Sequence, residues 1–427
     1  MKILVIAHNS FSDVLNNGKT LESLFKNFEK DQIAQLFFSE NEIPDFNFCN
    51  NYYKITDIDV FKSIFKNKNL CGKQIIQSTE YKIMDQRKNG LLLKSFNFAK
   101  KYSDKIVLFR DYLWKFNSWK SKGLYTWIEN FKPNAIFYVG GDSGFSHEIA
   151  VFLSNRYNIP LSIYFTDDYL IFPKNRNIFD FLQRKRMKKF YNKTVSKSEL
   201  SYAIGDSMAE EYTNFFNKKF LPIMNSIENV SYHPYIQKNN KIIISYFGGL
   251  HLNRWKMLIK FAEATSNAQV NIYSIANPEK DVLEKFKKAG IQFKGSVSGN
   301  DLQNAILASD VLLHVESDDD YNRLLTKLSI STKIPEYLIS GRLVIGFGPT
   351  DVASMKILSS NNIGIVLSSE ISKDVLREEL DKIVTNFELR KKIGKRGYDY
   401  AVENFNNQII AEDFKKRLLH LAKHNEY

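Results

Sequence analysis

Residues 331–349 read Ser-Thr-Lys-Ile-Pro-Glu-Tyr-Leu-Ile-Ser-Gly-Arg-Leu-Val-Ile-Gly-Phe-Gly-Pro, and this stretch decides the expected fold. Proline is favoured near the start of a helix and glycine just after its end, so Pro335 and Gly341 predict a helix over 333–340. The apolar run after Gly341 predicts a buried strand. Glu336 lies in the first helical turn, where the helix dipole stabilises a negative charge.

The carboxylate of Glu336 has two interpretations at this position. It can accept hydrogen bonds from two neighbouring hydroxyl groups, such as those of a ribose. Alternatively, it only caps the first turn and pairs with the helix dipole.

Apolar runs alternate with amphipathic segments along most of the chain, which is the pattern of a doubly wound parallel sheet. After position 241 the expected strands are Ile242–Phe247, Gln269–Ser274, Ile291–Lys294, Val311–Val315 and Leu343–Gly346. The helices expected there are Arg254–Ser266, Pro278–Ala289, Asp301–Ala308 and Lys333–Ser340. In the first half, strands are expected at Lys2–Ala7, Ala135–Val139, Ser162–Phe165 and Tyr202–Ile204, with a mostly helical, aromatic-rich region between Lys73 and Lys132.

The alternation stops in residues 226–240, which are polar and contain Pro234. These residues are the predicted linker between two domains, residues 1–225 and 241–400, each long enough for its own hydrophobic core. The predicted fold is α/β, with two Rossmann-like doubly wound domains that face each other across a cleft. Because ligands of such sheets bind at the carboxyl ends of the strands, the cleft is the expected site.

The composition limits the classes of partner. The chain of 427 residues carries 60 lysines and arginines against 47 aspartates and glutamates, a formal net charge of +13, which favours an anionic partner. No nucleic-acid-binding module is recognisable, so no nucleic-acid partner is expected. Neither a membrane-spanning run nor a signal-peptide core is present, and Cys49 and Cys71 are too few for a disulfide framework or a zinc site. A cytoplasmic protein is expected.

Residues 174–197 are the most basic stretch of the chain. Phe179, Leu182, Phe190 and Tyr191 can line one face of a helix, with lysines and arginines around them. Such a helix is suited to an anionic membrane surface, which would place the protein peripherally on the inner face of the cell membrane. A solvated helix packed by its aromatic side is an equal alternative.

Three short motifs favour ordinary structure over a specific site. Residues 17–20, Asn-Gly-Lys-Thr, look like the end of a phosphate-binding P-loop, but that motif needs a glycine where Asp13 stands. A glycine-containing loop that opens a helix at a ligand site, or a plain helix start, fits better. Residues 346–349 lack the rest of a dinucleotide fingerprint. Residues 318–320, three aspartates, are more typical of a solvated loop than of a metal site.

The stretch 331–349 resembles the donor-site signature of retaining GT-B glycosyltransferases of family 4, the large family that includes sucrose synthases and bacterial polysaccharide transferases. Other segments resemble this family in the same order along the chain, so that the likeness covers most of residues 130–420. These segments are Ala203–Met208, Ser245–Gly249 with Arg254, Ile291–Gly295, Ala308–Leu312 and Phe387–Phe405.

The resemblance implies a role for each matching residue. Glu336 would hold the donor ribose, and Arg254, where the family usually has a lysine, would contact the diphosphate together with Lys333. The further donor-binding residues that it implies are Gly248, Gly249, Ser331, Gly348 and Pro349. The acceptor-side residues that it implies are Gly18, Lys19 and Asp168. The last helix, within 401–427, is expected to cross back to the first domain.

Two further positions of the second domain depart from the family pattern. The first of the family's two glutamates would stand at Leu328, and the usual arginine after the glycine loop would stand at Leu250. The first departure puts the contacts to the transferred sugar in doubt, and Ser329 or Ser331 is the nearest substitute.

The resemblance implies a hexosyltransferase that moves a sugar from a nucleotide sugar to a hydroxyl of a glycan or lipid-linked acceptor with retention. Bacterial surface polysaccharide synthesis is the expected setting. Neither a cofactor nor a metal is expected, because cations and helix N-termini can stabilise the leaving diphosphate. A nucleotide-sugar epimerase, a glycan phosphorylase and a non-catalytic nucleotide-sugar- or glycan-binding protein on the same fold are the alternatives.

Overall fold

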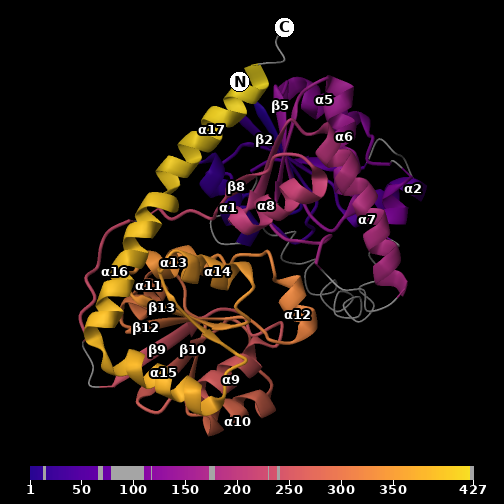
Figure 1. Cartoon of the computed structure of the whole chain (residues 1–427). Helices are drawn as coiled ribbons and strands as arrows, with labels where there is room; N and C mark the ends of the chain where they lie inside the picture. The colour runs from indigo at the N-terminus through magenta and orange to yellow at the C-terminus, as the bar shows by residue number, and fades with distance from the viewer. Residues whose placement is uncertain are drawn as a thin grey trace. The chain divides into compact units, whose positions relative to one another are not determined.

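The computed structural model describes residues 1–12, 16–65, 71–77, 110–116, 118–172, 178–228, 230–237 and 241–423 (Figure 1). The chain divides into two compact units. Unit 1 comprises Met1–Ile171, Asn175–Ile223 and Gln408–Tyr427, and unit 2 comprises Phe172–Lys174 and Met224–Asn407. Most of the region that the sequence predicts as helical and aromatic-rich, and the first residues of the basic stretch 174–197, lie outside the described residues.

Unit 1 is built on an eight-stranded sheet in the order β4-β3-β2-β1-β5-β6-β7-β8. All neighbouring strands pair in parallel except β3 and β4. The strands are β1 (Ile3–Ala7), β2 (Ile33–Phe37), β3 (Asn51–Lys54), β4 (Lys73–Ile75), β5 (Ala135–Gly140), β6 (Leu161–Phe165), β7 (Leu200–Ile204) and β8 (Leu221–Ile223). The helices are α1 (Asn16–Phe25), α2 (Asp57–Phe65), α5 (Lys122–Phe131), α6 (Gly144–Tyr157), α7 (Ile178–Lys197), α8 (Gly205–Phe216) and α17 (Asn407–Lys423).

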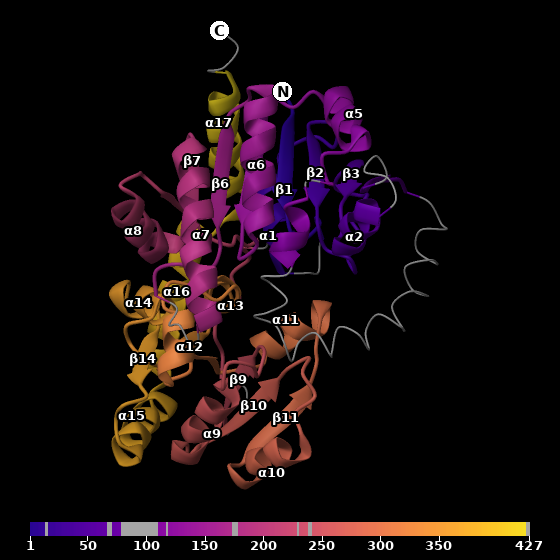
Figure 2. The ribbon, with the colours of Figure 1, turned by 90° about the vertical axis from the view of Figure 1, so that its right-hand side faces the viewer.

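The helices cover both faces of this sheet. Figure 2 shows α6 and α7 in front of the strands and α17 behind them. On the α17 face, the ring of Phe414 lies 5.1 Å from the rings of both Phe25 and Phe137, measured between centroids. The C-terminal helix is therefore part of the hydrophobic core of unit 1. It begins at Asn407, inside the predicted range 401–427.

Unit 2 has a six-stranded, all-parallel sheet in the order β11-β10-β9-β12-β13-β14. The strands are β9 (Ile242–Phe247), β10 (Ala268–Tyr273), β11 (Ile291–Gly295), β12 (Val311–Val315), β13 (Leu343–Gly348) and β14 (Ile365–Ser368). The helices are α9 (Arg254–Ala264), α10 (Lys280–Lys288), α11 (Gly299–Leu307), α12 (Asp320–Leu325), α13 (Lys333–Ile339), α14 (Ala353–Ser360), α15 (Lys373–Thr385) and α16 (Phe387–Asn404). Every strand and helix predicted after position 241 is present, with ends shifted by one or two residues.

The segment predicted as a linker is anchored on unit 2 instead of lying free. The Tyr235 hydroxyl donates to Asp310 Oδ1 at 2.9 Å and accepts from Arg390 Nε at 3.1 Å. Arg342 Nη1 donates to the carbonyl of His233 at 2.9 Å. Two buried arginines, each satisfied by several acceptors, therefore hold this polar segment, and its composition does not reveal those partners.

Candidate functional site

The candidate site lies where β9, β12 and β13 end. These three strands are neighbours in the sheet and run in parallel, so that their carboxyl ends meet at one edge. The glycine loop and α9 follow β9, Glu316 follows β12, and Gly348 and Pro349 close β13. The structure therefore brings the predicted residues of 248–254 and 348–349 to the edge at which α/β sheets bind ligands.

Arg254 forms an ion pair with a carboxylate that the sequence interpretation missed. Its Nη2 donates to both oxygens of Glu316, at 3.1 and 3.0 Å. Glu316 is 3% exposed. His314 on β12 is 4% exposed, and its Nε2 lies 3.2 Å from Glu316 Oε1. His314 and Glu316 are two residues apart, so they project from the same face of an extended chain.

Burial and the attraction between the two charges have opposite effects on the pKa of each group in this pair. Burial raises the pKa of Glu316, but the hydrogen bond from His314 and the charge of Arg254 outweigh burial and leave it below its usual value. Burial lowers the pKa of Arg254, and the attraction of Glu316 outweighs this effect and raises it. Both groups are therefore ionised near neutral pH.

The loop before α9 sets the position of Arg254. Leu252 and Asn253 have φ of 57° and 60°, a left-handed conformation that is costly for a leucine. Asn253 Nδ2 donates to Asp319 Oδ2 at 3.1 Å, which ties this loop to the segment after β12. Arg254 is thereby the first residue of an 11-residue helix whose N-terminal N–H groups favour anions.

The other predicted cation, Lys333, pairs with Glu336. Lys333 Nζ lies 2.7 Å from Glu336 Oε2, and both side chains are partly exposed. Ser331 Oγ accepts from the N–H of Lys333 at 3.3 Å, and the N–H of Ser331 donates to Ser354 Oγ at 3.1 Å. The structure thus brings together three of the predicted residues, and Ser331 orders the start of α13.

Tyr337 joins this helix to the strand that ends in the glycine loop. Its buried hydroxyl accepts from the N–H of Phe247 at 2.9 Å and donates to the carbonyl of Phe247 at 3.0 Å. Since Glu336 precedes Tyr337 and Gly248 follows Phe247, the helix start and the glycine loop belong to one connected structure. Leu328, where the family pattern has a glutamate, is 3% exposed and serves as a core residue.

The predicted glycines are explained by close packing within the protein. The N–H of Gly248 donates to the carbonyl of Tyr273 at 3.1 Å. A Cβ at Gly249 would lie 2.4 Å from His251 Nδ1, and one at Gly348 would lie 2.6 Å from the carbonyl oxygen of Glu316. The approach of phosphate or sugar to these glycines stays a prediction.

The predicted acceptor-side residues lie in unit 1. Gly18 is in the first turn of α1, where a Cβ would meet the Ser10 carbonyl oxygen at 2.5 Å, and Lys19 is exposed beside it. Asp168 follows β6 and is 2% exposed. Its Oδ1 accepts from the N–H groups of residues 170 and 171, both at 2.9 Å, and from the Tyr212 hydroxyl at 3.0 Å. Asp168 therefore stabilises the loop after β6. Contact of these acceptor-side residues with an acceptor stays a prediction.

The pair His314 and Glu316 had a recognisable signal in the sequence. In residues 311–316, Val-Leu-Leu-His-Val-Glu, two ionisable side chains alternate with apolar ones at the end of a buried strand. Buried charges are usually paired, so this pattern predicts a cationic partner nearby. Of the neighbouring aspartates, Asp319 caps α12 by accepting from the N–H of Asn322 at 3.1 Å.

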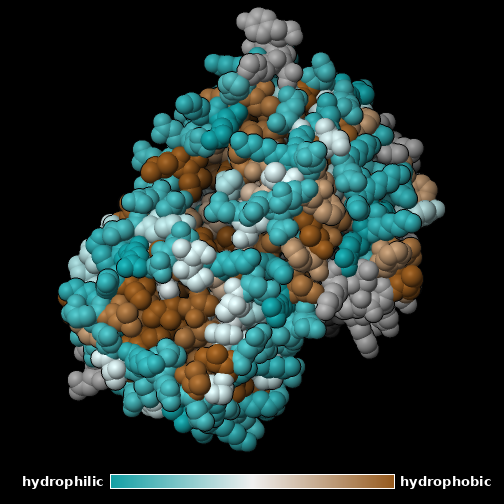
Figure 3. All heavy atoms as spheres, viewed as in Figure 1, coloured by the Kyte–Doolittle hydropathy of each residue, from teal (hydrophilic) through white to brown (hydrophobic). Residues whose placement is uncertain are grey.

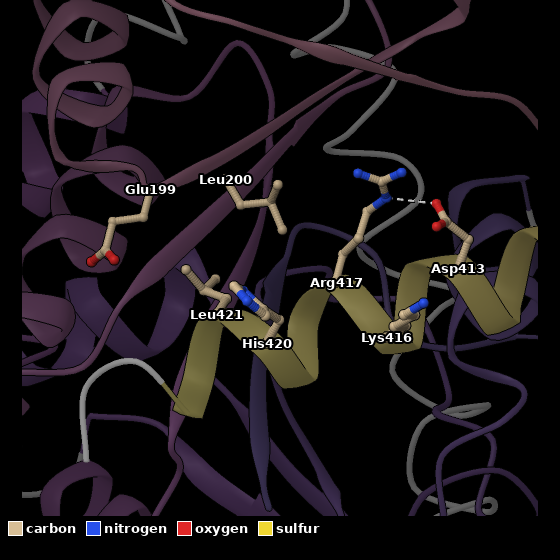
Figure 4. Close-up of a pocket in the computed structure, with 7 residues that line it drawn as sticks. All are labelled: Glu199, Leu200, Asp413, Lys416, Arg417, His420 and Leu421. Atoms are coloured by element: carbon tan, nitrogen blue, oxygen red, sulfur yellow. Dashed lines mark hydrogen bonds and ion pairs between the residues drawn. The ribbon is translucent and has the colours of Figure 1, made fainter. Parts of the chain in front are cut away.

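A surface hollow of about 420 Å³ lies elsewhere, in unit 1 (Figure 4). Glu199 and Leu200, at the start of β7, face α17, from which Lys416, His420 and an Arg417–Asp413 pair line the hollow. Ligands of α/β sheets bind at the opposite, carboxyl ends of the strands. The edge of unit 2 is therefore the better candidate.

No group of three or more His, Cys, Asp or Glu residues in the described ranges is placed to hold a metal ion. None of the described helices is both long and apolar enough to cross a membrane.

In sequence, the chain is similar to the uncharacterized glycosyltransferase MJ1069 of Methanocaldococcus jannaschii. The identity is 23% over 258 residues, which are 55% of this chain and 62% of that protein. The match thus spans less than two thirds of the relative's length. No protein-family model matches the chain.

In structure, the chain is similar to Anabaena Alr3699/HepE, solved in complex with UDP, with a TM-score of 0.62 at 12% identity over 98% of this chain and 100% of that one. It is also similar to WaaG, a glycosyltransferase involved in lipopolysaccharide biosynthesis, with a TM-score of 0.58 at 11% identity over 96% and 99% of the two chains. These likenesses and the two parallel-dominated sheets confirm the predicted fold class, two Rossmann-like domains of the GT-B type.

Proposed function

We propose that this protein is a glycosyltransferase that moves a hexose from a nucleotide sugar to a hydroxyl of a glycan or lipid-linked acceptor, with retention of configuration. The observation that carries the proposal is Arg254, held by a buried carboxylate at the N-terminus of α9. A fixed cation at a helix N-terminus is suited to a diphosphate. The similarity to the glycosyltransferases MJ1069 and WaaG supports this activity.

The chemistry assigned to the site is stabilisation of the leaving group. Cleavage of the bond between sugar and diphosphate places negative charge on the departing phosphate oxygen. Arg254, Lys333 and the N–H groups at the start of α9 are the donors proposed to stabilise that charge. In this proposal Glu336 accepts hydrogen bonds from the ribose hydroxyls, and Lys333 leaves its ion pair to meet the phosphate. The departing phosphate itself helps to take the acceptor proton, so no side chain is assigned as nucleophile.

UDP-sugars are the proposed donors. Anabaena Alr3699/HepE, which shares the fold, has been solved in complex with UDP and with UDP-glucose. Surface polysaccharide synthesis in the cytoplasm of a bacterium is the proposed setting, in keeping with the involvement of WaaG in lipopolysaccharide biosynthesis.

A membrane-facing role is proposed for the first half of α7. Ile178, Phe181 and Leu182 are 62%, 48% and 49% exposed, whereas Phe190 and Tyr191 in the second half are buried. Of the four aromatic and aliphatic residues named from the sequence, two are therefore exposed and two are buried. Figure 3 shows hydrophobic side chains at this end of α7, at the lower right. Apolar side chains beside Arg184, Lys185 and Lys188 are suited to an anionic bilayer surface.

Nucleotide binding followed by sugar transfer tests the proposal. UDP, GDP, ADP and CMP are screened by thermal shift, and a ligand at 100 times its Kd stabilises the fold by about 2.7 kcal/mol. We expect UDP to stabilise the wild type, Glu336→Ala to lose most of this shift, and a UDP-sugar to release UDP faster when an acceptor is added. Glu379→Ala is the matched control, because Glu379 forms the same kind of ion pair three residues from Lys382.

Three outcomes would redirect the assignment. UDP release without dependence on an acceptor favours an epimerase. Binding of a UDP-sugar without turnover across a panel of glycan and lipid-linked acceptors favours a binding protein. The absence of a shift with any nucleotide contradicts the proposed function itself.

A further inference from the structure

The hydrogen bonds of Arg254 use one edge of its guanidinium and leave another. Nη2 donates to both oxygens of Glu316. Nη1 lies 3.4 Å from His251 Nε2, at the limit of a hydrogen bond. Nε is buried and has no hydrogen-bond partner among the described residues. Because Nε is closed to solvent, Nη1, whose long contact with His251 is exposed, is the donor that a ligand oxygen can reach.

Glu316 is fixed on the other side of Arg254. Its backbone N–H donates to the carbonyl of Phe347 at 3.1 Å, and Gly348 packs directly against its backbone. His314 Nε2 lies behind the carboxylate at 3.2 Å, and the side chain of Glu316 is 4% exposed. The carboxylate therefore has no solvent-facing alternative, and the cation is held where the carboxylate directs it.

We propose that Glu316 is the positioning residue of the donor site, which holds Arg254 by Nη2 so that Nη1 binds the diphosphate of a nucleotide sugar. This inference rests on the proposed function and adds residues to which no role in the site has been assigned. Fixing an arginine before the ligand arrives removes the cost of ordering its flexible side chain on binding.

The arrangement also explains why an arginine stands where the resembling family usually has a lysine. A guanidinium is a planar fork that can bind a carboxylate on one edge and a phosphate on another. A lysine ammonium is a single point charge. Beside Glu316 its charge would be neutralised, and it has no second set of donors directed at a phosphate. The arginine at position 254 and the buried Glu316 therefore act together.

A double-mutant cycle on UDP binding tests the inference. The Kd for UDP is measured by calorimetry for wild type, Glu316→Gln, Arg254→Met and the double variant, and for Glu263→Gln as control. Glu263 lies on α9 itself and forms an ion pair with Lys373 at an exposed position. We expect Glu316→Gln to weaken UDP by ~10- to 100-fold, as the removal of residues that orient a metal ligand does. The same change in the Arg254→Met protein has no further effect.

Each result decides one question. Failure of the wild type to bind UDP contradicts the proposed function, whereas wild-type binding that Glu316→Gln leaves unchanged overturns only the positioning role. An equal loss in both backgrounds indicates a purely structural glutamate. If Glu316→Gln does not fold, His314→Gln, which leaves the ion pair in place, is measured instead. A loss of UDP affinity that disappears in Arg254→Met supports the inference, and no loss overturns it.

Discussion

Gly348 lies so close to Glu316 that a Cβ on the glycine would be 2.6 Å from the glutamate's carbonyl oxygen. The glycine also has φ of 154°, which L-residues rarely adopt. The end of β13 can therefore approach the segment after β12 only without a side chain. This contact fixes the backbone of Glu316, and the carboxylate of Glu316 in turn holds Arg254.

Gly348→Ala is expected to lower the free energy of unfolding by about 2 kcal/mol or more, because overpacking and backbone strain add. The corresponding fall in melting temperature is about 4 °C or more. Gly290→Ala is the control: Gly290 has φ of 73°, but a Cβ there would meet no atom within 4 Å. Only strain is introduced at that position, and a loss of about 1 kcal/mol is expected. Equal losses in the two variants would show that the contact with Glu316 is unimportant.

Tyr337→Phe is expected to destabilise the protein by about 2 kcal/mol. The variant leaves the N–H and carbonyl of Phe247 without their shared partner in a buried position. It is also expected to weaken UDP binding, because the start of α13 and the glycine loop lose their link. Tyr273→Phe, which removes a half-buried hydroxyl from a ring stacked 4.5 Å from Phe247, is the control in both measurements. An unchanged melting temperature in Tyr337→Phe would contradict the structural role.

The sequence predicted most strands of unit 2 but missed β14 and the helices α12, α14 and α15. The reason for the success is visible in the central strands. In β12 and β13 every residue is buried, so that β13 reads as a continuous apolar run and β12 as an apolar run interrupted only by His314. In unit 1 the strands β2, β3, β4 and β8 were missed, and β4 lies in the region predicted as mostly helical. β2 contains Gln35, whose buried amide accepts from the N–H of Phe11 and donates to the carbonyl of Asn9, and β3 reads Asn-Tyr-Tyr-Lys. Polar residues that are satisfied by tertiary partners interrupt the pattern on which the prediction depends.

The sequence predicted which residues belong to the candidate site, but not which side chains pair with one another. Arg254, Lys333 and Glu336 were named, and the last two pair with each other three residues apart on one helix. The partner of Arg254 follows from the order β9-β12-β13, which no local pattern encodes. Glu316 is 62 residues from Arg254 along the chain and comes beside it only because β12 is inserted next to β9. Without that order, the carboxylate is one of many acidic residues.

Stability is expected to fall between about pH 6.5 and pH 4 because of His147. Burial lowers the pKa of this histidine from 6.5 to about 4. Its Nε2 donates to the carbonyl of Gly141, and its Nδ1 lies 3.0 Å from the Thr194 hydroxyl oxygen. Above pH 6.5 His147 is neutral in both the folded and the unfolded chain, and its contribution to the free energy of unfolding is complete. As the pH falls below 6.5, the unfolded chain takes up the proton first, and about 3 kcal/mol is lost by pH 4.

Urea unfolding at pH 7 and pH 5 measures this effect. The wild type is expected to lose about 2 kcal/mol more than His147→Gln between these values, because glutamine does not titrate. His420→Gln, at an exposed position on α17, should lose as much as the wild type. Parallel losses in wild type and His147→Gln would show that His147 is not kept neutral by burial.

Asp168→Ala is expected to lower the free energy of unfolding by about 2 kcal/mol, whereas Asp168→Asn should lose less than about 1 kcal/mol. Alanine leaves two backbone N–H groups and the Tyr212 hydroxyl without their acceptor, while the amide oxygen of asparagine can replace the Oδ1 that all three use. Melting temperature and the rate of sugar transfer are measured on both variants. If the carboxylate only stabilises its loop, Asp168→Asn retains the transfer rate together with the fold. A loss of transfer of about tenfold or more in a fully stable Asp168→Asn protein would instead place the charge of Asp168 at the acceptor, as the sequence resemblance implies.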